Sequence, residues 1–324
     1  SSCSAPAEVP IEGARDTGAM NGTLRVAQLS DTHFLEAGLE PEGGHSYDTS
    51  EAFEAVLADL GQQADIDLVV VTGDIADHGT AEQYDIAAAA LARLPAPVYV
   101  CPGNHDSDAG FRAGFGSPEL HTPRITHHGP WSFVFADSNA GAMTPDDNGR
   151  LVDPPGEERL HRNGALGEHE QAWLRAAAAG HDTEHVFVWV HHPPDADIPM
   201  ANDPAYTAEW QAVTAACSKI RGFGAGHTHI PSTYTFEGRP VFVSPAFKNN
   251  FDLEASTWLP PGYRTYDFGS DGTVTSEVHL VDDERWPRRP FGRTLRSLFM
   301  GEISFNELAE IVARRAGDDP AASI

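Results

Sequence analysis

The chain has 324 residues, with 21 Lys and Arg against 48 Asp and Glu, and its formal net charge is −27. An apolar fraction of 40% with 21% charged residues is ordinary for a globular protein and excludes a disordered chain or a coiled coil. A surface this acidic repels the phosphate backbone of DNA or RNA, so we expect no nucleic-acid partner.

The N-terminal stretch, residues 1–22, contains Pro, Gly and Ala and is expected to be a flexible lead-in. Its Ser1-Ser2-Cys3-Ser4 sequence faintly resembles a lipoprotein processing site, but no charged segment or apolar region precedes it. No apolar run approaches the roughly 18 residues that span a bilayer, so we expect no transmembrane segment. We therefore expect a cytoplasmic protein, with a lost export or lipoprotein signal as the open alternative.

From Leu24 onward, short apolar runs alternate with helical stretches, which is typical of an α/β domain. We assign this domain to residues 23–281. The expected strands are Leu24–Ser30, Leu68–Thr72, Val98–Cys101, Trp131–Ala136, Val186–Val190, Gly222–Ala225 and Pro240–Val243. The expected helices are one that Thr49-Ser50 opens, Ala81–Leu94 and Gly167–Ala179. The turn Gly269-Ser270-Asp271-Gly272 predicts a hairpin between Tyr263–Phe268 and Val274–Leu280.

Three stretches do not belong to this minimal core. Residues 106–130 and 142–166 are expected to be long loops over one face, either functional lids or simply mobile. Residues 282–324 are expected to be a basic, proline-broken linker followed by an amphipathic helix, which a capping box from Ser304 to Glu307 opens. This helix packs either against the core or against a second subunit, which gives a homodimer. Contact with anionic membrane lipid is the alternative.

Side chains that can bind metal follow the predicted strands one after another. Each group stands where an apolar strand ends, which is where α/β sheets usually carry their sites. A spacing of two residues in extended backbone, as in Asp31-x-His33 and His227-x-His229, turns both side chains to the same side. In chain order the groups are Asp31-Thr32-His33, Gly73-Asp74, Gly103-Asn104-His105-Asp106, His191-His192 and Gly226-His227-Thr228-His229.

Each group alone has an ordinary explanation. An Asp-x-His triplet is usually a surface or turn feature, and Gly-Asp after a strand is usually a turn. Five such groups in order, each at a strand end and each with metal-competent atoms, are hard to obtain as a structural accident. We therefore predict one metal centre built from them. Bound cations would also supply the positive charge that an anionic substrate needs on so acidic a chain.

With these groups in place, the chain resembles the calcineurin-like metallophosphoesterases over residues 24–281. The motifs that carry the resemblance are Asp31-x-His33, Gly73-Asp74-x-x-Asp77, Gly103-Asn104-His105-Asp106, His191 and Gly226-His227-x-His229. Three stretches are also similar to the bacterial class III 3′,5′-cyclic-nucleotide phosphodiesterases. These are residues 69–77 with Gly79, residues 98–106, and Pro261-Gly262-Tyr263-Arg264. Related glycerophosphodiesterases share most of these motifs.

The resemblance implies a four-layer α/β/β/α sandwich with a C-terminal helical extension and a two-metal site at the sandwich edge. The implied ligands of the first metal are Asp31, His33, Asp74 and His229. Those of the second are Asp74, Asn104, His191 and His227, with Asp74 bridging. Nitrogen and oxygen ligands without thiolate suit Mn, Fe or Zn. The family pattern selects His191 rather than His192 as the ligand, which leaves His192 beside the ligands or at the surface.

The resemblance also implies a mechanism. Two dications about 3.5–4 Å apart lower the pKa of a bridging water, and the resulting hydroxide attacks phosphorus in line. His105 is the family-matched residue to protonate or stabilise the departing alkoxide. Asn104, His105 and His229 are the expected substrate contacts. The implied function is a metal-dependent phosphoric diester hydrolase that converts 3′,5′-cyclic AMP to 5′-AMP.

Several alternatives remain open at this point. The substrate can instead be a glycerophosphodiester, or the enzyme a phosphoesterase of broad specificity. Trp131, Phe251 and Trp258 are candidate stacking groups for a base, with core or loop packing as the alternative. The loop Lys248-Asn249-Asn250 after the last core strand is a candidate contact for phosphate or ribose. A non-catalytic scaffold of the same fold is the competing class, but a scaffold has no need of the complete ligand set together with His105.

Overall fold

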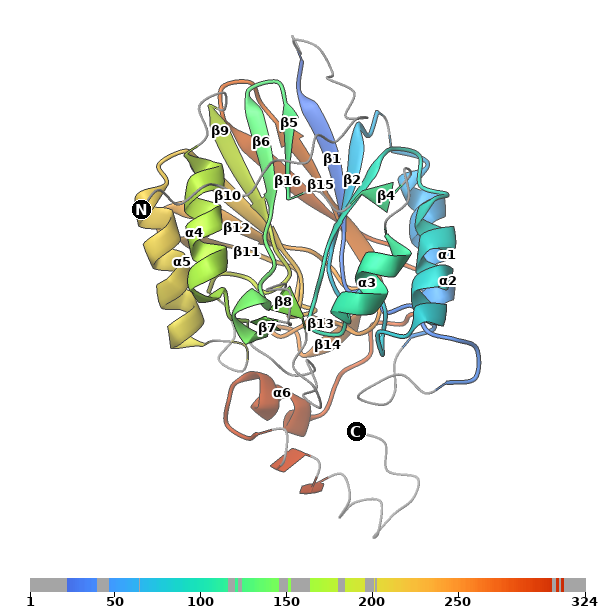
Figure 1. Ribbon diagram of the computed structural model, residues 1–324. Coiled ribbons are helices and arrows are strands. Elements are labelled where there is room, and N and C mark those ends of the chain that lie inside the picture. Colours follow the sequence, from blue (N-terminus) through green and yellow to red (C-terminus); the bar gives the residue numbers. More distant parts are fainter. Residues whose placement is uncertain are drawn as a thin grey trace.

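The chain forms two six-stranded sheets packed face to face, with helices on both outer faces (Figure 1). This is the four-layer α/β/β/α arrangement that the sequence predicts. The structure is a computed structural model. It describes residues 22–39, 47–63, 65–115, 120–121, 124–145, 151–152, 164–179, 184–195, 201, 203–304, 307–308 and 310–311.

The first sheet has the order β16-β15-β1-β2-β3-β4 and is parallel from β1 to β4, with the hairpin of β15 and β16 added antiparallel to β1. Helices α1 to α3 cover its outer face (Figure 1). Its strands are β1 (Leu24–Leu29), β2 (Leu68–Thr72), β3 (Val98–Cys101), β4 (Leu120–His121), β15 (Gly262–Phe268) and β16 (Val274–Leu280). The helices are α1 (Thr49–Leu60), α2 (Ala81–Leu91) and α3 (Asp108–Gly114).

The second sheet has the order β11-β12-β10-β9-β6-β5, and its four middle strands are parallel. Helices α4 and α5 cover its outer face (Figure 1). Its strands are β5 (Ile125–His128), β6 (Trp131–Phe135), β9 (His185–Trp189), β10 (Ile220–Ala225), β11 (Ser232–Phe236) and β12 (Arg239–Val243). The helices are α4 (Gly167–Ala178) and α5 (Pro204–Ala216). Beside the sheets lie the short pairs β7 (Thr144–Pro145) with β8 (Leu151–Val152), and β13 (Asn250–Asp252) with β14 (Thr257–Leu259).

The central parallel strands β2 and β9 are mostly apolar because both of their faces are covered. All five residues of β2 and all five of β9 are buried. In β2, Val69 and Val71 pack toward the helices of their own sheet, whereas Val70 packs between the two sheets. The space between the sheets is filled largely by aromatic rings, among them those of Phe187 and Trp189.

Truncation of Trp189 to alanine tests this central layer. The indole is fully buried between the sheets, so Trp189→Ala should lower the free energy of unfolding by about 3–5 kcal/mol. Urea unfolding followed by circular dichroism measures this change. Met300→Ala, at a side chain that is 42% exposed, is the control and should stay within about 0.5 kcal/mol of the parent protein.

The predicted strands are confirmed, with ends that agree to within two residues, and so is the predicted hairpin around residues 269–272. The expectation of a long loop over residues 106–130 was wrong in part, because α3 and β5 lie there. Ser107 caps α3 by accepting a hydrogen bond from the Gly110 amide, and β5 pairs with β6 through a tight turn. Helix α5 was not predicted. Much of 142–166 lies outside the described residues.

The C-terminal region was also predicted incompletely. Helix α6 (Arg293–Phe299) forms within the stretch expected to be a linker, and its Phe299 packs with Phe251 of β13. The capping box is present: the amide of Ser304 donates to Glu307 Oε2 at 2.7 Å, and the amide of Glu307 donates to Ser304 Oγ at 3.2 Å. Residues 1–21 and 312–324 lie outside the described part of the chain. Within the part described, no helix is both long and apolar enough to cross a membrane.

Candidate metal centre

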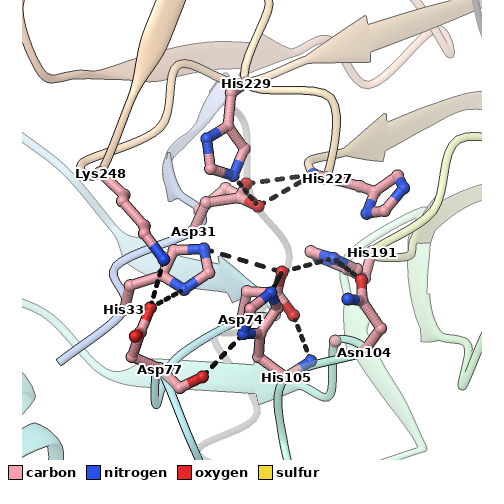
Figure 2. Close-up of polar contacts among 12 residues, drawn as sticks. Asp31, His33, Asp74, Asp77, Asn104, His105, His191, His227, His229 and Lys248 are labelled. Atoms are coloured by element: carbon pink, nitrogen blue, oxygen red, sulfur yellow. Dashed lines mark hydrogen bonds and ion pairs between the residues drawn. The ribbon is translucent and has the colours of Figure 1, made fainter. Parts of the chain in front are cut away.

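The predicted ligand groups converge where the carboxyl ends of the parallel strands of both sheets meet (Figure 2). The first sheet contributes residues that follow β1, β2 and β3, and the second contributes residues that follow β9 and β10. The structure brings together all eight candidate residues, which are Asp31, His33, Asp74, Asn104, His105, His191, His227 and His229. The site therefore depends on the two sheets being packed together.

The backbone at this edge is strained in a way that points to a function. Positive φ angles are uncommon outside glycine and, when the surrounding structure enforces them, they concentrate at functional sites. Five of the candidate residues adopt them, namely Asp31 (52°), His33 (43°), Asp74 (49°), His227 (69°) and His229 (55°). Strands β1, β2 and β10 thus each end in a sharp turn that directs these side chains into the shared site.

Two glycines of the motifs allow the loops to approach one another closely. A Cβ on Gly73, whose φ is +82°, would stand 2.6 Å from His191 Nδ1. A Cβ on Gly226 would stand 1.9 Å from Ser30 Oγ and 2.6 Å from Asp31 Oδ2. These positions require glycine because the ligand-bearing loops of the two sheets touch there.

Three imidazoles are oriented by backbone carbonyl groups. Nδ1 of His191 donates to the carbonyl of Thr72 at 2.8 Å, and Nδ1 of His229 donates to that of Asn249 at 2.8 Å. In the same way, Nδ1 of His105 donates to the carbonyl of residue 77 at 2.7 Å. A carbonyl oxygen only accepts, so each Nδ1 carries the proton and Nε2 is the nitrogen left to face the centre. This arrangement is typical of histidines that bind a metal.

The distances between the candidate ligands fit shared metal ions. Nε2 of His191 lies 3.2 Å from Asp74 Oδ2 and 3.1 Å from Asn104 Oδ1, and Nε2 of His229 lies 3.2 Å from Asp31 Oδ1. Two ligands that are each about 2.1 Å from one ion stand roughly 3.0–3.4 Å apart. Nε2 of His33 is buried without a hydrogen-bond partner among the described residues and faces Asp74 Oδ2 at 3.7 Å. A buried, unsatisfied imidazole nitrogen beside a carboxylate suits a cation.

The charges of the site compensate one another within a buried volume. Burial raises the pKa of Asp31, but the neighbouring His229 outweighs it and brings the value to about 2. Burial lowers the pKa of His191, but the carboxylates of Asp74 and Asp31 raise it to about 9. Burial and the adjacent His191 lower the pKa of His227 to about 3. Carboxylates therefore stay ionised here, which is the form that binds a metal.

Residues around the ligands hold the loops in place. The Asp106 carboxylate accepts hydrogen bonds from the backbone amides of Gly103 (2.9 Å) and Ile75 (3.2 Å), which ties two ligand loops together. Burial and the charge of Asp74 raise the pKa of Asp106. His192 is buried rather than at the surface: its Nδ1 lies 2.7 Å from Ser138 Oγ, and its ring centroid lies 4.2 Å from that of His227.

The candidate base-stacking residues divide into two groups. Trp131 is buried between the sheets and belongs to the core. Phe251 lies near the centre, with its ring nearly parallel to that of His229 at a centroid distance of 6.5 Å, and Trp258 packs on Phe251. A cavity of about 350 Å³ lies next to His229, lined by residues that include Thr228, Ile230, Phe251, Asp252 and Glu254.

Sequence reasoning missed the position of Lys248. Its ammonium was a candidate contact for phosphate or ribose, but it is buried and lies 2.5 Å from Asp77 Oδ1. The signal in the sequence is the scarcity of lysine, since the chain has two lysines, Lys219 and Lys248. No motif spacing relates Lys248 to Asp77, because the two are 171 residues apart.

A family model of calcineurin-like phosphoesterases matches residues 24–231, which include all eight candidate residues. The chain belongs to this family. It is therefore a metal-dependent phosphoesterase, and the scaffold alternative is set aside.

Proteins with similar sequences cover most of the chain. The 3′,5′-cyclic adenosine monophosphate phosphodiesterase of Escherichia coli strain K12 is 27% identical over 278 residues, which are 81% of this chain and 92% of the relative. The enzyme of the same name from Pseudomonas aeruginosa is 27% identical over 281 residues, which are 83% and 94% of the two chains.

Solved structures share the fold. A dimetal phosphatase from Danio rerio matches with a TM-score of 0.55 and 16% identity, over 81% of this chain and all of the other. A purple acid phosphatase from yellow lupin matches with a TM-score of 0.53 and 15% identity, over 83% of this chain and 53% of the other. At these identities the likeness concerns the architecture alone.

Proposed function

We propose that this protein is a phosphodiesterase that hydrolyses 3′,5′-cyclic AMP to 5′-AMP at a centre of two divalent metal ions. The observation that carries the proposal is the double set of ligands that meets at Asp74. On one side Asp74 Oδ2 faces His33, and on the other it faces His191. The relatives named as cyclic AMP phosphodiesterases support the substrate.

We assign the ligands from this geometry and from the family motifs. The first ion is held by Asp31, His33, Asp74 and His229. The second is held by Asp74, Asn104, His191 and His227. All of these donors are nitrogen or oxygen atoms, which suits Mn, Fe or Zn.

When bound, the two ions supply Lewis-acid chemistry, since they neutralise phosphate oxygens and generate a nucleophile from water at neutral pH. The chain's own residues then orient the diester and complete the reaction. Asn104, His105 and His229 surround the position of the phosphate. The His105 amide donates to Asp74 Oδ1 at 2.9 Å, which holds His105 beside the centre. The proton that His105 hands to the departing alkoxide is a second one, carried on Nε2, which lies 4.0 Å from Asp74 Oδ2.

A metal analysis with a small substrate panel tests the proposal. Purified protein is assayed with added Mn²⁺ and with chelator on 3′,5′-cyclic AMP, a glycerophosphodiester, bis(4-nitrophenyl) phosphate and 4-nitrophenyl phosphate. We expect two metal ions per chain and chelator-sensitive cleavage of the diesters, with cyclic AMP giving the highest kcat/KM. A higher kcat/KM for the glycerophosphodiester would show that the proposed substrate is wrong, whereas the proposed reaction, diester hydrolysis, would stand. A higher value for the monoester would overturn the diesterase proposal itself.

A further inference from the structure

Lys248 is a buried cation at the edge of the metal centre. Its side chain follows β12 in the loop of residues 247–249 and is 4% exposed. Removing an ammonium group from water is costly unless an opposite charge receives it, and here the carboxylate of Asp77 does so at 2.5 Å. The pair lies among the ligands rather than in the core of either sheet (Figure 2).

Asp77 connects this lysine to two residues of the site. Its Oδ1 also lies 3.0 Å from His33 Nδ1, and its backbone carbonyl accepts the hydrogen bond from His105 Nδ1 at 2.7 Å. Its Oδ2 lies 3.4 Å from Nε2 of the exposed His78. One residue thus contacts both a proposed metal ligand and the proposed proton donor, and Lys248 holds its carboxylate.

The rest of the loop contacts the same half of the centre. The amide of Phe247 donates to the carbonyl of Asp31 at 3.2 Å, and the carbonyl of Asn249 accepts from Nδ1 of His229 at 2.8 Å. Residues 247–249 therefore touch Asp31 and His229 and, through Asp77, His33. These are three of the four ligands assigned to the first metal.

We propose that Lys248 is a positioning residue of the metal centre, which fixes Asp77 and through it the orientation of His33 at the first metal. The negative charge of Asp77, 3.0 Å from Nδ1, attracts the ring proton to that nitrogen and leaves Nε2 to bind metal. Without the ammonium, the Asp77 carboxylate is a buried charge that lacks this partner, and His33 loses its fixed orientation. The proposal rests on the two-metal centre of the proposed function. It predicts that loss of the ammonium weakens binding of the first metal and leaves binding of the second unchanged.

The experiment measures metal binding directly. Metal-free protein is titrated with Co²⁺ alone, and the binding phases are followed by visible absorption. For Lys248→Met, we expect one phase to weaken about 10–100-fold while the other stays within about 3-fold. Lys219→Met, which removes the other lysine, should leave both phases unchanged. Two unchanged phases in Lys248→Met would overturn the proposal.

A double-mutant cycle shows whether the lysine acts through Asp77. If it does, Asp77→Asn combined with Lys248→Met should bind Co²⁺ no more weakly than Asp77→Asn alone. Additive losses would overturn this route. Thermal unfolding of the metal-free protein shows whether Lys248→Met folds. If it does not, the double variant replaces it in the Co²⁺ titration, because the double variant has lost both charges of the pair and leaves neither one buried alone. In that case one selectively weakened phase supports the proposal, and two unchanged phases reject it.

Kinetics separate positioning from direct contact with substrate. With saturating metal, Lys248→Met should keep the parent KM for bis(4-nitrophenyl) phosphate. A raised KM with unchanged metal binding would mean that Lys248 contacts the phosphate, and the positioning role would be wrong. If the parent protein gives a single phase for one Co²⁺ ion, the two-metal part of the proposed function fails. The positioning role is then decided by whether that phase weakens in Lys248→Met.

Discussion

Replacement of Asp74 by asparagine is expected to lower kcat for diester hydrolysis by about 10³-fold or more and to reduce the metal content of the purified protein. The carboxylate is almost fully buried, and its Oδ2 lies within 4.0 Å of the Nε2 atoms of His191, His33 and His105. Asparagine keeps the shape of the side chain and removes its negative charge. A loss of 10³-fold corresponds to about 4 kcal/mol of transition-state stabilisation, which is a reasonable share for the residue that we propose as the ligand of both metal ions.

Asp106→Asn is the matched control for this prediction, because Asp106 is an equally buried carboxylate three residues from a glycine of the same site. Its carboxylate accepts hydrogen bonds from backbone amides and from the hydroxyl of Tyr84, so it holds the loops together. We expect Asp106→Asn to lower the thermal unfolding temperature and to retain two metals. Metal content by mass spectrometry and kcat on bis(4-nitrophenyl) phosphate separate the two variants. An Asp74→Asn protein with two metals and the parent kcat would show that Asp74 is not the shared ligand.

The sheets and the ligand groups could be predicted because their signals are local. Buried parallel strands such as β2 are continuous apolar runs, and the polar residues directly after them stand out against that background. The parallel topology then forces these strand ends to one edge. Asp31, Asp74 and His191 could therefore be grouped before any contact was known.

Helix α5 could have been predicted from its own sequence. Asp203 accepts from the amides of Ala205 and Tyr206, and Pro204 stands at the first helical position, where its missing N–H costs nothing. Tyr206, Trp210 and Val213 then recur at helical spacing and are buried. A proline was here the start of a helix rather than a break.

The surroundings of the metal centre could not be read from spacing. The pairing of Lys248 with Asp77 and the packing of Phe251 against α6 join segments that are far apart in sequence. Such contacts are set by how the two sheets and the β13–β14 hairpin pack. The composition gave one indication. The chain has two lysines, and the burial of one of them indicates a specific role for that residue.

Removal of the His105 imidazole is the second change with a large expected effect. His105→Ala should lower kcat for 3′,5′-cyclic AMP by about 10²–10⁴-fold, because the departing ribose alkoxide needs a proton and general acids contribute about that much. Bis(4-nitrophenyl) phosphate releases a nitrophenolate, which is a stable anion, so its kcat should fall much less. Both metals should remain. The measurements are kcat on the two diesters and metal content per chain.

The dependence on the leaving group distinguishes this role from others available to the same histidine. His33, Asp74 and His105 also lie close enough together to hold an ion among themselves. If His105 were a ligand, His105→Ala would lose metal, and both diesters would slow by similar factors. His127→Ala, at an exposed histidine of the edge strand β5, is the control and should change neither rate. Equal losses of kcat on both diesters with full metal content would mean that His105 contacts the phosphate and does not protonate the leaving alkoxide.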